Sequence, residues 1–305
     1  MTETSRGILS MVAACTIWGL SPLYYKLLTH IPPIEVLAHR TLWSFALFAV
    51  VLALQGRLGA LAQAVRSRRS LGIIALAALV ISVNWFTFIS SIQMNKAIEA
   101  SLGYFIFPLV SVALGALVYR ETLGRAQIFA VALATLAVVT LAWGLGVAPW
   151  LSLILAVSFG FYGVIKKGFD MGPVISVTAE VLLLIPLAVA VLVIAAPTGP
   201  GPFGRGWSDM GLLLLSGPLT AAPLILFSAA ARRVSLATVG LVQYLNPTLQ
   251  FGVATLIFAE PFTRWHMIAF PMIWLGLAVY TAAAWRQDRA ARKALKRAST
   301  SVTRW

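Results

Sequence analysis

The stretch from residue 105 to residue 125, FIFPLVSVALGALVYRETLGR, recurs in altered form at residues 244–264 as YLNPTLQFGVATLIFAEPFTR. Each contains an aromatic residue, two residues, a proline, twelve residues, a glutamate, three residues and an arginine. A shift of 139 residues aligns Phe105 with Tyr244, Pro108 with Pro247, Glu121 with Glu260, and Arg125 with Arg264. In both copies the proline lies inside an apolar run and the charged residues follow it. The pattern predicts an internal repeat whose loop ion pairs lock or gate the fold; the alternative is a chance coincidence.

The whole chain is too apolar for a soluble protein. Its 305 residues are 60% hydrophobic and 10% charged, with a mean hydropathy of +0.91, whereas soluble domains are about half apolar and about a quarter charged. The apolar runs are continuous and about twenty residues long, the length of a helix that crosses ~30 Å of hydrocarbon. A transmembrane barrel would instead alternate apolar and polar residues in segments of roughly ten. We therefore predict an all-α membrane protein.

The apolar runs predict ten transmembrane helices. They are residues 7–29, 33–55, 71–93, 98–119, 125–143, 148–165, 173–196, 208–230, 235–259 and 265–285. The repeat divides the chain into a first five-helix repeat at 1–146, a second at 147–285, and a basic cytoplasmic tail at 286–305. Five is an odd number, so the halves must enter the membrane in opposite orientations. Inverted repeats are typical of secondary transporters, whose substrate site lies between the halves near the midplane.

The distribution of basic residues predicts the orientation. With ten spans both termini lie on one side, which holds 18 of the 23 Lys and Arg residues, whereas the other side holds 4. Cytoplasmic loops carry the excess of Lys and Arg, so we place both termini in the cytoplasm of a bacterial inner membrane. This bias accounts for the formal net charge of +14 without a nucleic-acid partner. The tail either contacts anionic membrane lipid or simply stops translocation.

Several short motifs resemble a known family. They are IWG at 17–19 with Lys26, EVLAHR at 35–40 with Trp43 and Ser44, Asn84-Trp85, EASLGYF at 99–105 with Pro108, Gln243-Tyr244, and Pro247-Thr248. From about residue 6 to residue 286 the chain resembles the RarD-type permeases of the drug/metabolite transporter superfamily, also called EamA-like. The resemblance implies a ten-helix, two-repeat fold with a central cavity, and secondary transport, usually export, of metabolites or drugs. Asparagine often precedes the first-half proline in that family, whereas this chain has Phe107 there and Asn246 before the second proline.

Two charged residues stand out because they lie well inside predicted spans, where a charge costs at least ~2.5 kcal/mol. Arg40 and Glu180 each lie about seven residues into a span, roughly 10 Å below the surface, and are 140 positions apart, close to the repeat shift. Either they face a wet cavity and bind the solute, with Glu180 able to take up a coupling proton, or they lock the fold as an ion pair. His39 could titrate near neutral pH. Adjacent helical residues point about 100° apart, so His39 and Arg40 cannot both face a cavity squarely.

Polar and aromatic residues inside the spans complete the predicted substrate site. A carrier cavity needs a few oriented hydrogen-bonding groups and aromatic walls to replace the hydration of its solute. Besides His39, Arg40 and Glu180, the candidates are Trp18, Asn84, Trp85, Tyr104, Tyr162, Gln243, Tyr244 and Asn246. Alternatively, the aromatic residues form interfacial belts and the amides hold helices together. Pro108 and Pro247 free backbone carbonyls and bend their helices, so we predict that they are hinges.

The sequence carries no motif of another functional class. It has no P-loop, HExxH or Gly-x-Ser-x-Gly, and its single cysteine and scattered histidines lack metal-ligand spacing. We therefore expect no enzyme activity, no cofactor and no metal. The expected function is secondary active transport. A channel is the second candidate within transport, and the lack of rings of like charge disfavours it. A membrane-embedded enzyme or a non-transporting scaffold is the alternative.

The expected solute is a small polar or amphipathic metabolite, such as an amino acid or a drug-like molecule, exported by alternating access. Both signs of charge occur within the spans, which favours a zwitterionic or polar solute. A proton is the candidate coupling ion. The sequence leaves open the identity of the solute and the oligomeric state.

Overall fold

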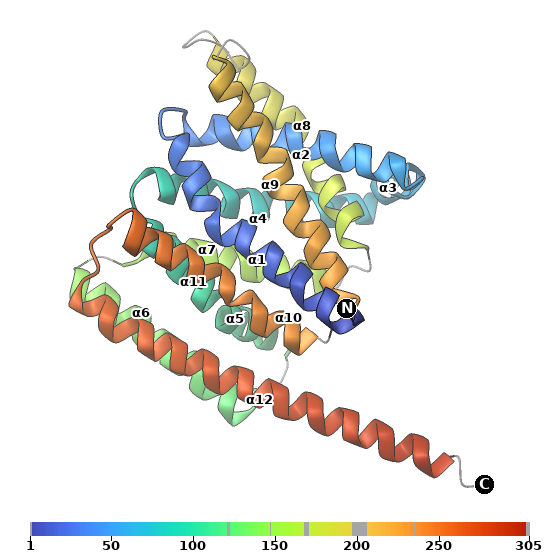
Figure 1. Ribbon diagram of the computed structural model, residues 1–305, viewed down its shortest axis with the longest axis vertical. Coiled ribbons are helices and arrows are strands. Elements are labelled where there is room, and N and C mark those ends of the chain that lie inside the picture. The colour runs from blue at the N-terminus through green and yellow to red at the C-terminus, as the bar shows by residue number, and fades with distance from the viewer. Residues whose placement is uncertain are drawn as a thin grey trace.

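The computed structural model describes residues 2–302 apart from 121–122, 147, 168–170, 197–205 and 235, and without the side chains of 167, 236–237, 284–285 and 287–302. Every regular element in this described part is a helix (Figure 1). Eight of these helices are long and apolar enough to cross a membrane, and a shorter apolar helix spans Trp150–Lys166. The prediction of an all-helical membrane fold is therefore confirmed for the described residues.

Most helices begin and end close to the predicted spans, but the last one continues to residue 302, beyond the predicted end at 285. They are α1 (Glu3–Leu27), α2 (Pro33–Leu54), α3 (Leu58–Arg66), α4 (Arg68–Gln93), α5 (Ala97–Tyr119), α6 (Arg125–Leu145), α7 (Trp150–Lys167), α8 (Pro173–Ala195), α9 (Trp207–Ala231), α10 (Leu236–Gln243), α11 (Leu245–Gly252), the π-helical turn η2 (Val253–Ile257) and α12 (Arg264–Val302). Pro33 and Pro173 begin α2 and α8 at a position where a missing N–H costs no hydrogen bond. The Thr2 side chain caps α1 by accepting a hydrogen bond from the Ser5 N–H.

The loop expected after the second span contains a helix, α3, that the hydropathy pattern did not predict. Its nine residues are too few to cross a membrane. It buries Leu61 and Ala64 in a cluster with Ile175 of α8, and it packs against that helix. Short amphipathic helices of this kind lie in the plane of the membrane interface. Its own buried face, rather than a long apolar run, stabilises it.

The span predicted at 235–259 is broken into α10, α11 and η2, which corrects the expectation of one continuous helix. Proline has no N–H, so Pro247 cannot donate to the carbonyl four residues earlier, which belongs to Gln243. The first segment ends at that residue. Pro108 frees the carbonyl of Tyr104 in the same way, yet α5 continues through it as one helix. A proline therefore interrupts one of the two aligned helices but not the other.

Helices from the first part of the chain pack against helices from the second part. α1 packs against α9, and α7 packs against α4; α5 packs against α7, and α1 packs against α10 and α11. Direct contacts between the halves join α2 with α8, α6 with α12, and α5 with α11. α6 and α12 lie side by side along the lower edge of Figure 1, whereas α8 and α9 lie at its top. Helices from both halves thus surround the middle of the bundle.

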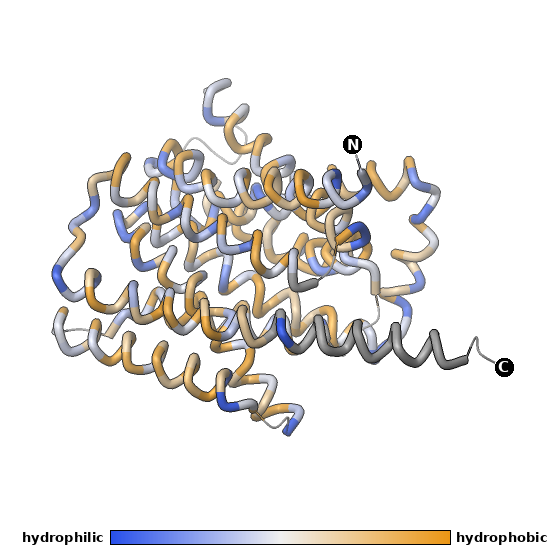
Figure 2. The backbone as a smooth tube through the Cα atoms, turned by 60° about the horizontal axis from the view of Figure 1, so that its bottom comes forward, coloured by the Kyte–Doolittle hydropathy of each residue, from blue (hydrophilic) through white to orange (hydrophobic). Residues whose placement is uncertain are grey.

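The outer face of the bundle is apolar. The exposed fractions of the Leu256 and Ile194 side chains are 85% and 74%, and a soluble monomer rarely exposes large apolar patches. Figure 2 shows hydrophobic colour along most of the helices, with hydrophilic colour mainly at their ends and turns. The largest buried cluster, which includes Ile31, Leu102 and Phe270, joins helices of both halves. The outer surface is therefore suited to contact with lipid rather than with water.

Candidate functional site

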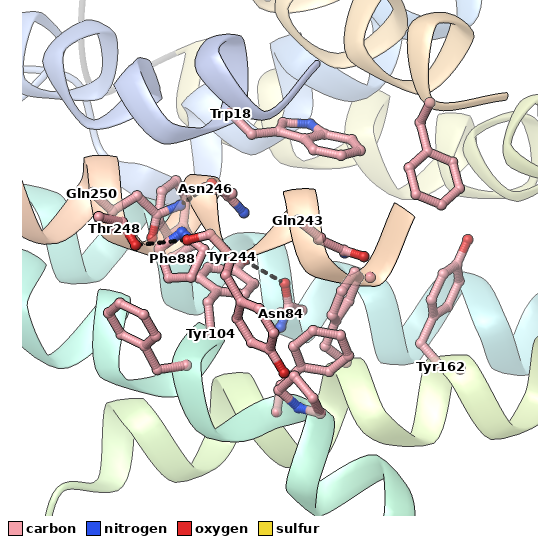
Figure 3. Close-up of a pocket in the computed structure, with 18 of the residues that line it drawn as sticks. Trp18, Asn84, Phe88, Tyr104, Tyr162, Gln243, Tyr244, Asn246, Thr248 and Gln250 are labelled. Atoms are coloured by element: carbon pink, nitrogen blue, oxygen red, sulfur yellow. Dashed lines mark hydrogen bonds between the residues drawn. The ribbon is translucent and has the colours of Figure 1, made fainter. Parts of the chain in front are cut away.

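A cavity of about 1650 Å³ lies among the helices of both halves. Its walls are mostly aromatic and apolar, and they include Trp18, Trp85, Phe88, Phe159 and Tyr162. Drug-sized ligands occupy pockets of about 300–1,000 Å³, so this cavity has room for a small solute together with water. Figure 3 shows side chains from α1, α4, α5, α7, α10 and α11 gathered around it.

Nine of the eleven predicted site residues line this cavity. They are Trp18, Arg40, Asn84, Trp85, Tyr104, Tyr162, Gln243, Tyr244 and Asn246, and both predicted hinges, Pro108 and Pro247, lie in its wall. His39 and Glu180 do not line it. His39 is fully buried and outside the lining, which agrees with the angle of about 100° between adjacent helical residues. Glu180 is 1% exposed and lies behind two lining residues, Tyr162 and Lys166.

The cavity extends toward one end of the bundle only. That end, which we call the open end, is formed by the last turns of α7 and α9 and the start of α10, and its lining includes Lys166, Thr238 and Ala282. At the opposite, closed end lie the turns at 28–32, 94–96 and 258–263. Among the described residues, none of 27–39, 89–103 or 251–273 lines the cavity. The cavity therefore reaches the open end of the bundle and stops short of the closed end.

Polar contacts hold the closed end together. The carboxylate of Glu260 accepts hydrogen bonds from the N–H groups of Ala97 at 2.7 Å and Ile98 at 2.8 Å. These are free N–H groups at the start of α5, where the helix dipole favours a negative charge. The expected loop pair with Arg264 is replaced by this cap, and Glu121, its counterpart in the repeat, lies outside the described residues. Further contacts join Lys26 with Asn95, His30 with Asp209, Tyr24 with the Leu212 carbonyl, and Gln93 with the carbonyls of Leu28 and Ile31.

Arg40 lies at the inner limit of the cavity. Its Nε donates to Thr220 Oγ1 at 2.9 Å and its Nη1 donates to Tyr25 Oη at 3.0 Å. The guanidinium carbon lies 4.2 Å from the ring centroid of Trp85, a cation–π distance. Three helices, α1, α4 and α9, thus hold the side chain of α2 in place. Arg40 is only 8% exposed, yet it contributes to the lining of the cavity.

Glu180 is the centre of a second charged cluster. Its carboxylate accepts hydrogen bonds from Tyr162 Oη at 3.0 Å and from Ser176 Oγ at 3.1 Å, and it forms an ion pair with Lys166. The Lys166 ammonium also lies 5.2 Å from the ring centroid of Tyr162. Lys166 lines the cavity, so it stands between Glu180 and any solute. The predicted partner of Glu180, Arg40, is not its partner in this structure.

The Asn84 side chain links α4 to α5 and α7 by hydrogen bonds, so its amide is already paired within the protein. Its Nδ2 donates to the Leu155 carbonyl at 2.9 Å and to Ser158 Oγ at 3.0 Å on α7. Its Oδ1 accepts a hydrogen bond from Tyr104 Oη on α5 at 2.9 Å (Figure 3). Both amide hydrogens are therefore used by the protein. This geometry fits the alternative in which a lone amide holds helices together.

The break between α10 and α11 brings polar side chains to the cavity. Gln243, Tyr244 and Asn246 surround the interruption, as Figure 3 shows. The side chain of Thr248 donates to the Tyr244 carbonyl at 2.7 Å, and Gln250 Nε2 donates to Asn246 Oδ1 at 3.0 Å. Broken membrane helices next to a cavity are where secondary transporters place their substrates.

Several lining residues escaped prediction from the sequence. Tyr25, Phe159 and Gln250 read as ordinary helix residues, and Lys166 reads as a loop charge near the membrane surface. A signal for Lys166 exists, because only a few residues separate α7 from α8 in the sequence, so the end of one helix must lie close to the first turns of the next. No comparable signal identifies Tyr25 or Gln250, whose neighbours come from distant parts of the chain.

Comparisons with known proteins agree on one family. The profile of the EamA-like transporter family matches residues 5–143. The protein RarD of Streptomyces exfoliatus is 43% identical over 98% of this chain and 96% of its own length. An uncharacterized transporter of Pseudomonas aeruginosa is 41% identical over 93% and 96%, and the protein RarD of Escherichia coli is 35% identical over 91% and 94%. A crystal structure that covers 93% of this chain and 99% of its own has a TM-score of 0.61 at 19% identity, a likeness of fold alone.

Proposed function

Since this chain belongs to the EamA-like transporter family as a RarD-type permease, we propose that it is a secondary active carrier of a small polar or amphipathic metabolite. The observation that carries the proposal is the cavity, which is open at one end, closed at the other, and bordered by a broken helix. A carrier must present its site to one side of the membrane at a time. A pore open at both ends would argue for a channel instead.

The two-fold recurrence of helix contacts supports a ten-helix inverted repeat, with the first half at 1–146 and the second at 147–285. Under the repeat, α1 corresponds to α7, α2 to α8, α4 to α9, α5 to the α10–α11 pair, and α6 to α12. The strongest such contacts then have a mate: α1 with α9 corresponds to α7 with α4, and α5 with α7 corresponds to α11 with α1. An exchange of these corresponding contacts would close the open end and open the closed one.

The orientation follows from the basic residues. The open end carries the loops that hold most of the Lys and Arg residues, so we place it, with both termini, in the cytoplasm. The structure then represents an inward-facing state. Export is the direction that we propose, because an inward-facing cavity loads solute from the cytoplasm and alternation releases it outside.

We assign roles to the residues by their positions. Trp18, Trp85, Tyr104, Tyr162, Gln243, Tyr244 and Asn246 would form the wall that the solute contacts, Arg40 would bind it, and Pro108 and Pro247 would be hinges. His39 and Glu180 would act from behind the wall. We propose the Glu180–Lys166 pair as the proton-sensitive element, because protonation of the carboxylate would release the Lys166 ammonium into the cavity.

Solute counterflow in proteoliposomes tests the carrier proposal. Vesicles are loaded with unlabelled amino acids, organic acids or amphenicol drugs, and uptake of the labelled compound is followed with no ion gradient. A carrier gives transient accumulation of one class of compound. Glu180→Gln should keep this exchange and lose accumulation driven by a pH gradient. Linear leakage without counterflow would argue for a channel, and folded protein without exchange of any compound would argue for a scaffold.

A further inference from the structure

The charge that faces the cavity is positive. Two cationic side chains, Arg40 and Lys166, belong to the lining, whereas no carboxylate belongs to it among the described residues. Lys166 is paired with Glu180 from behind. The hydrogen bonds of the Arg40 side chain to described residues go to neutral groups, the hydroxyls of Thr220 and Tyr25. The net charge available to a solute is therefore the charge of Arg40.

Arg40 lines the cavity and keeps N–H groups for which the described residues provide no hydrogen bond. Nε and Nη1 of Arg40 each donate a hydrogen bond, whereas Nη2 donates none to the described part of the chain. The Trp85 ring lies against one face of the guanidinium and fixes its plane. A planar guanidinium held in this way matches the geometry of a carboxylate. A buried cation without a carboxylate partner is costly in a membrane, so an anionic solute would supply the missing charge.

A second polar group in the cavity lining has an atom without a hydrogen-bond partner among the described residues. Gln250 is 2% exposed and lines the cavity, and its Oε1 accepts no hydrogen bond from any described residue. Its Nε2 is already used by Asn246. A buried acceptor of this kind is costly unless a ligand or water supplies a donor. A hydroxyl or amide N–H on the solute would satisfy it.

We propose, on the basis of the carrier function proposed above, that the solute is an amphipathic organic acid. Its carboxylate binds Arg40, a neutral hydrogen-bond donor binds Gln250 Oε1, and its apolar or aromatic body lies against the aromatic wall. This replaces the expectation of a zwitterionic solute, since the negative charge counted in its favour, Glu180, does not face the cavity. An ammonium group would meet a cationic cavity with no carboxylate to receive it.

The test uses four compounds that share a benzyl body. They are 3-phenyllactate, with a carboxylate and a hydroxyl; 3-phenylpropionate, with the carboxylate alone; phenylalanine, a zwitterion; and phenylalanine amide, a cation. Counterflow and ligand-induced shifts of the thermal unfolding midpoint are measured with the full-length protein. We expect 3-phenyllactate to have the highest apparent affinity. The apparent affinity of phenylalanine amide should be lower by about tenfold to a hundredfold, the effect of one hydrogen bond to a charged group.

Variants separate binding from folding. Arg40→Gln should remove the preference for carboxylates, and Arg40→Lys should keep part of it. Gln250→Leu should lower the apparent affinity for phenyllactate to that for phenylpropionate. Arg233→Gln is the matched control, because Arg233 lies at the surface and pairs with the exposed Glu3. If Arg40→Gln does not fold, the Lys and Leu variants still decide the question.

The outcomes distinguish the inference from the carrier proposal. Exchange of the amide as fast as the acids, or an unchanged preference in the Arg40 variants, overturns the inference and leaves the carrier intact. Thermal shifts by the acids without counterflow support the inference and argue against transport. Neither counterflow nor a thermal shift by the acids at millimolar concentration overturns the inference.

Discussion

Lys166 at the end of α7 and Glu180 on α8 form an ion pair in the cavity wall. Arg40 lies 140 positions before Glu180, close to the proposed repeat shift of 139, yet its side chain contacts the hydroxyls of Thr220 and Tyr25 instead. The two charged residues that lie deep inside the spans, Arg40 and Glu180, therefore have different surroundings. One belongs to a pair inside the protein, and the other is directed at the cavity.

The ion pair makes a prediction about stability. Glu180→Gln and Lys166→Met should each lower the thermal unfolding midpoint, because each leaves one member without its partner. Breaking a buried pair costs about 3–5 kcal/mol, and the partial exposure of Lys166 reduces our expectation to about 2 kcal/mol. The double variant should recover much of the loss in a double-mutant cycle. Additive losses would show that the two residues are not coupled.

The Glu260 cap predicts how the closed end opens. Glu260→Gln removes the charge that binds the N–H groups of Ala97 and Ile98, so the closed end should open more often. A cysteine at Ser101, which is fully buried nearby on α5, should then react several-fold faster with an impermeant maleimide added to that side. Glu3→Gln, an exposed carboxylate at the other end, is the control. Equal labelling in both variants would remove Glu260 from the closing mechanism.

Pro247 predicts a difference between the two aligned helices. Pro247→Ala restores the N–H that can donate to the Gln243 carbonyl, and should join α10 and α11 into one helix. We expect slower counterflow with an unchanged or raised unfolding temperature. Pro108→Ala is the matched comparison, and we expect a smaller effect because α5 is already continuous. Faster counterflow in Pro247→Ala would argue against a hinge at the break.

Asn84 should behave as a structural residue. Asn84→Ala removes hydrogen bonds to α5 and α7 and leaves the Tyr104 hydroxyl without its acceptor. The loss of a buried partner costs about 1–3 kcal/mol, so the unfolding temperature should fall clearly while the solute affinity of the folded protein changes little. A selective loss of affinity at unchanged stability would place Asn84 in the binding site instead.

Gly19 predicts a close contact between α1 and α11. A Cβ atom there would lie 2.6 Å from Leu249 Cβ and 3.0 Å from the Asn246 carbonyl oxygen, so Gly19→Ala must push the helices apart and lower the unfolding temperature. Gly211→Ala on α9 meets no atom within 4 Å. It should be neutral or slightly stabilising, because alanine favours a helix by about 1 kcal/mol over glycine. Equal unfolding temperatures in the two variants would contradict this packing.

The sequence determined the class of the fold because the membrane imposes a length on each helix. Apolar runs of about twenty residues predicted the helices, and most observed bounds lie close to the predicted ones, apart from the broken span at 235–259 and the extension of α12 to Val302. The sequence also indicated most of the cavity, since polar residues such as Gln243 and Arg40 are costly inside a span unless they meet water or a partner. These inferences depend on each segment by itself and on its surrounding solvent.

Only the tertiary structure decided which groups meet. Glu260 caps a helix that begins 163 residues away, and Arg40 finds Thr220 from 180 residues away. Such contacts depend on which helices are neighbours and how they are rotated, and a rotation of about 100° per residue separates a cavity-facing side chain from a buried one. This is why Arg40 faces the cavity while His39 does not. The same packing placed Glu180 behind Lys166 and left the guanidinium of Arg40 as the charge that a solute would meet.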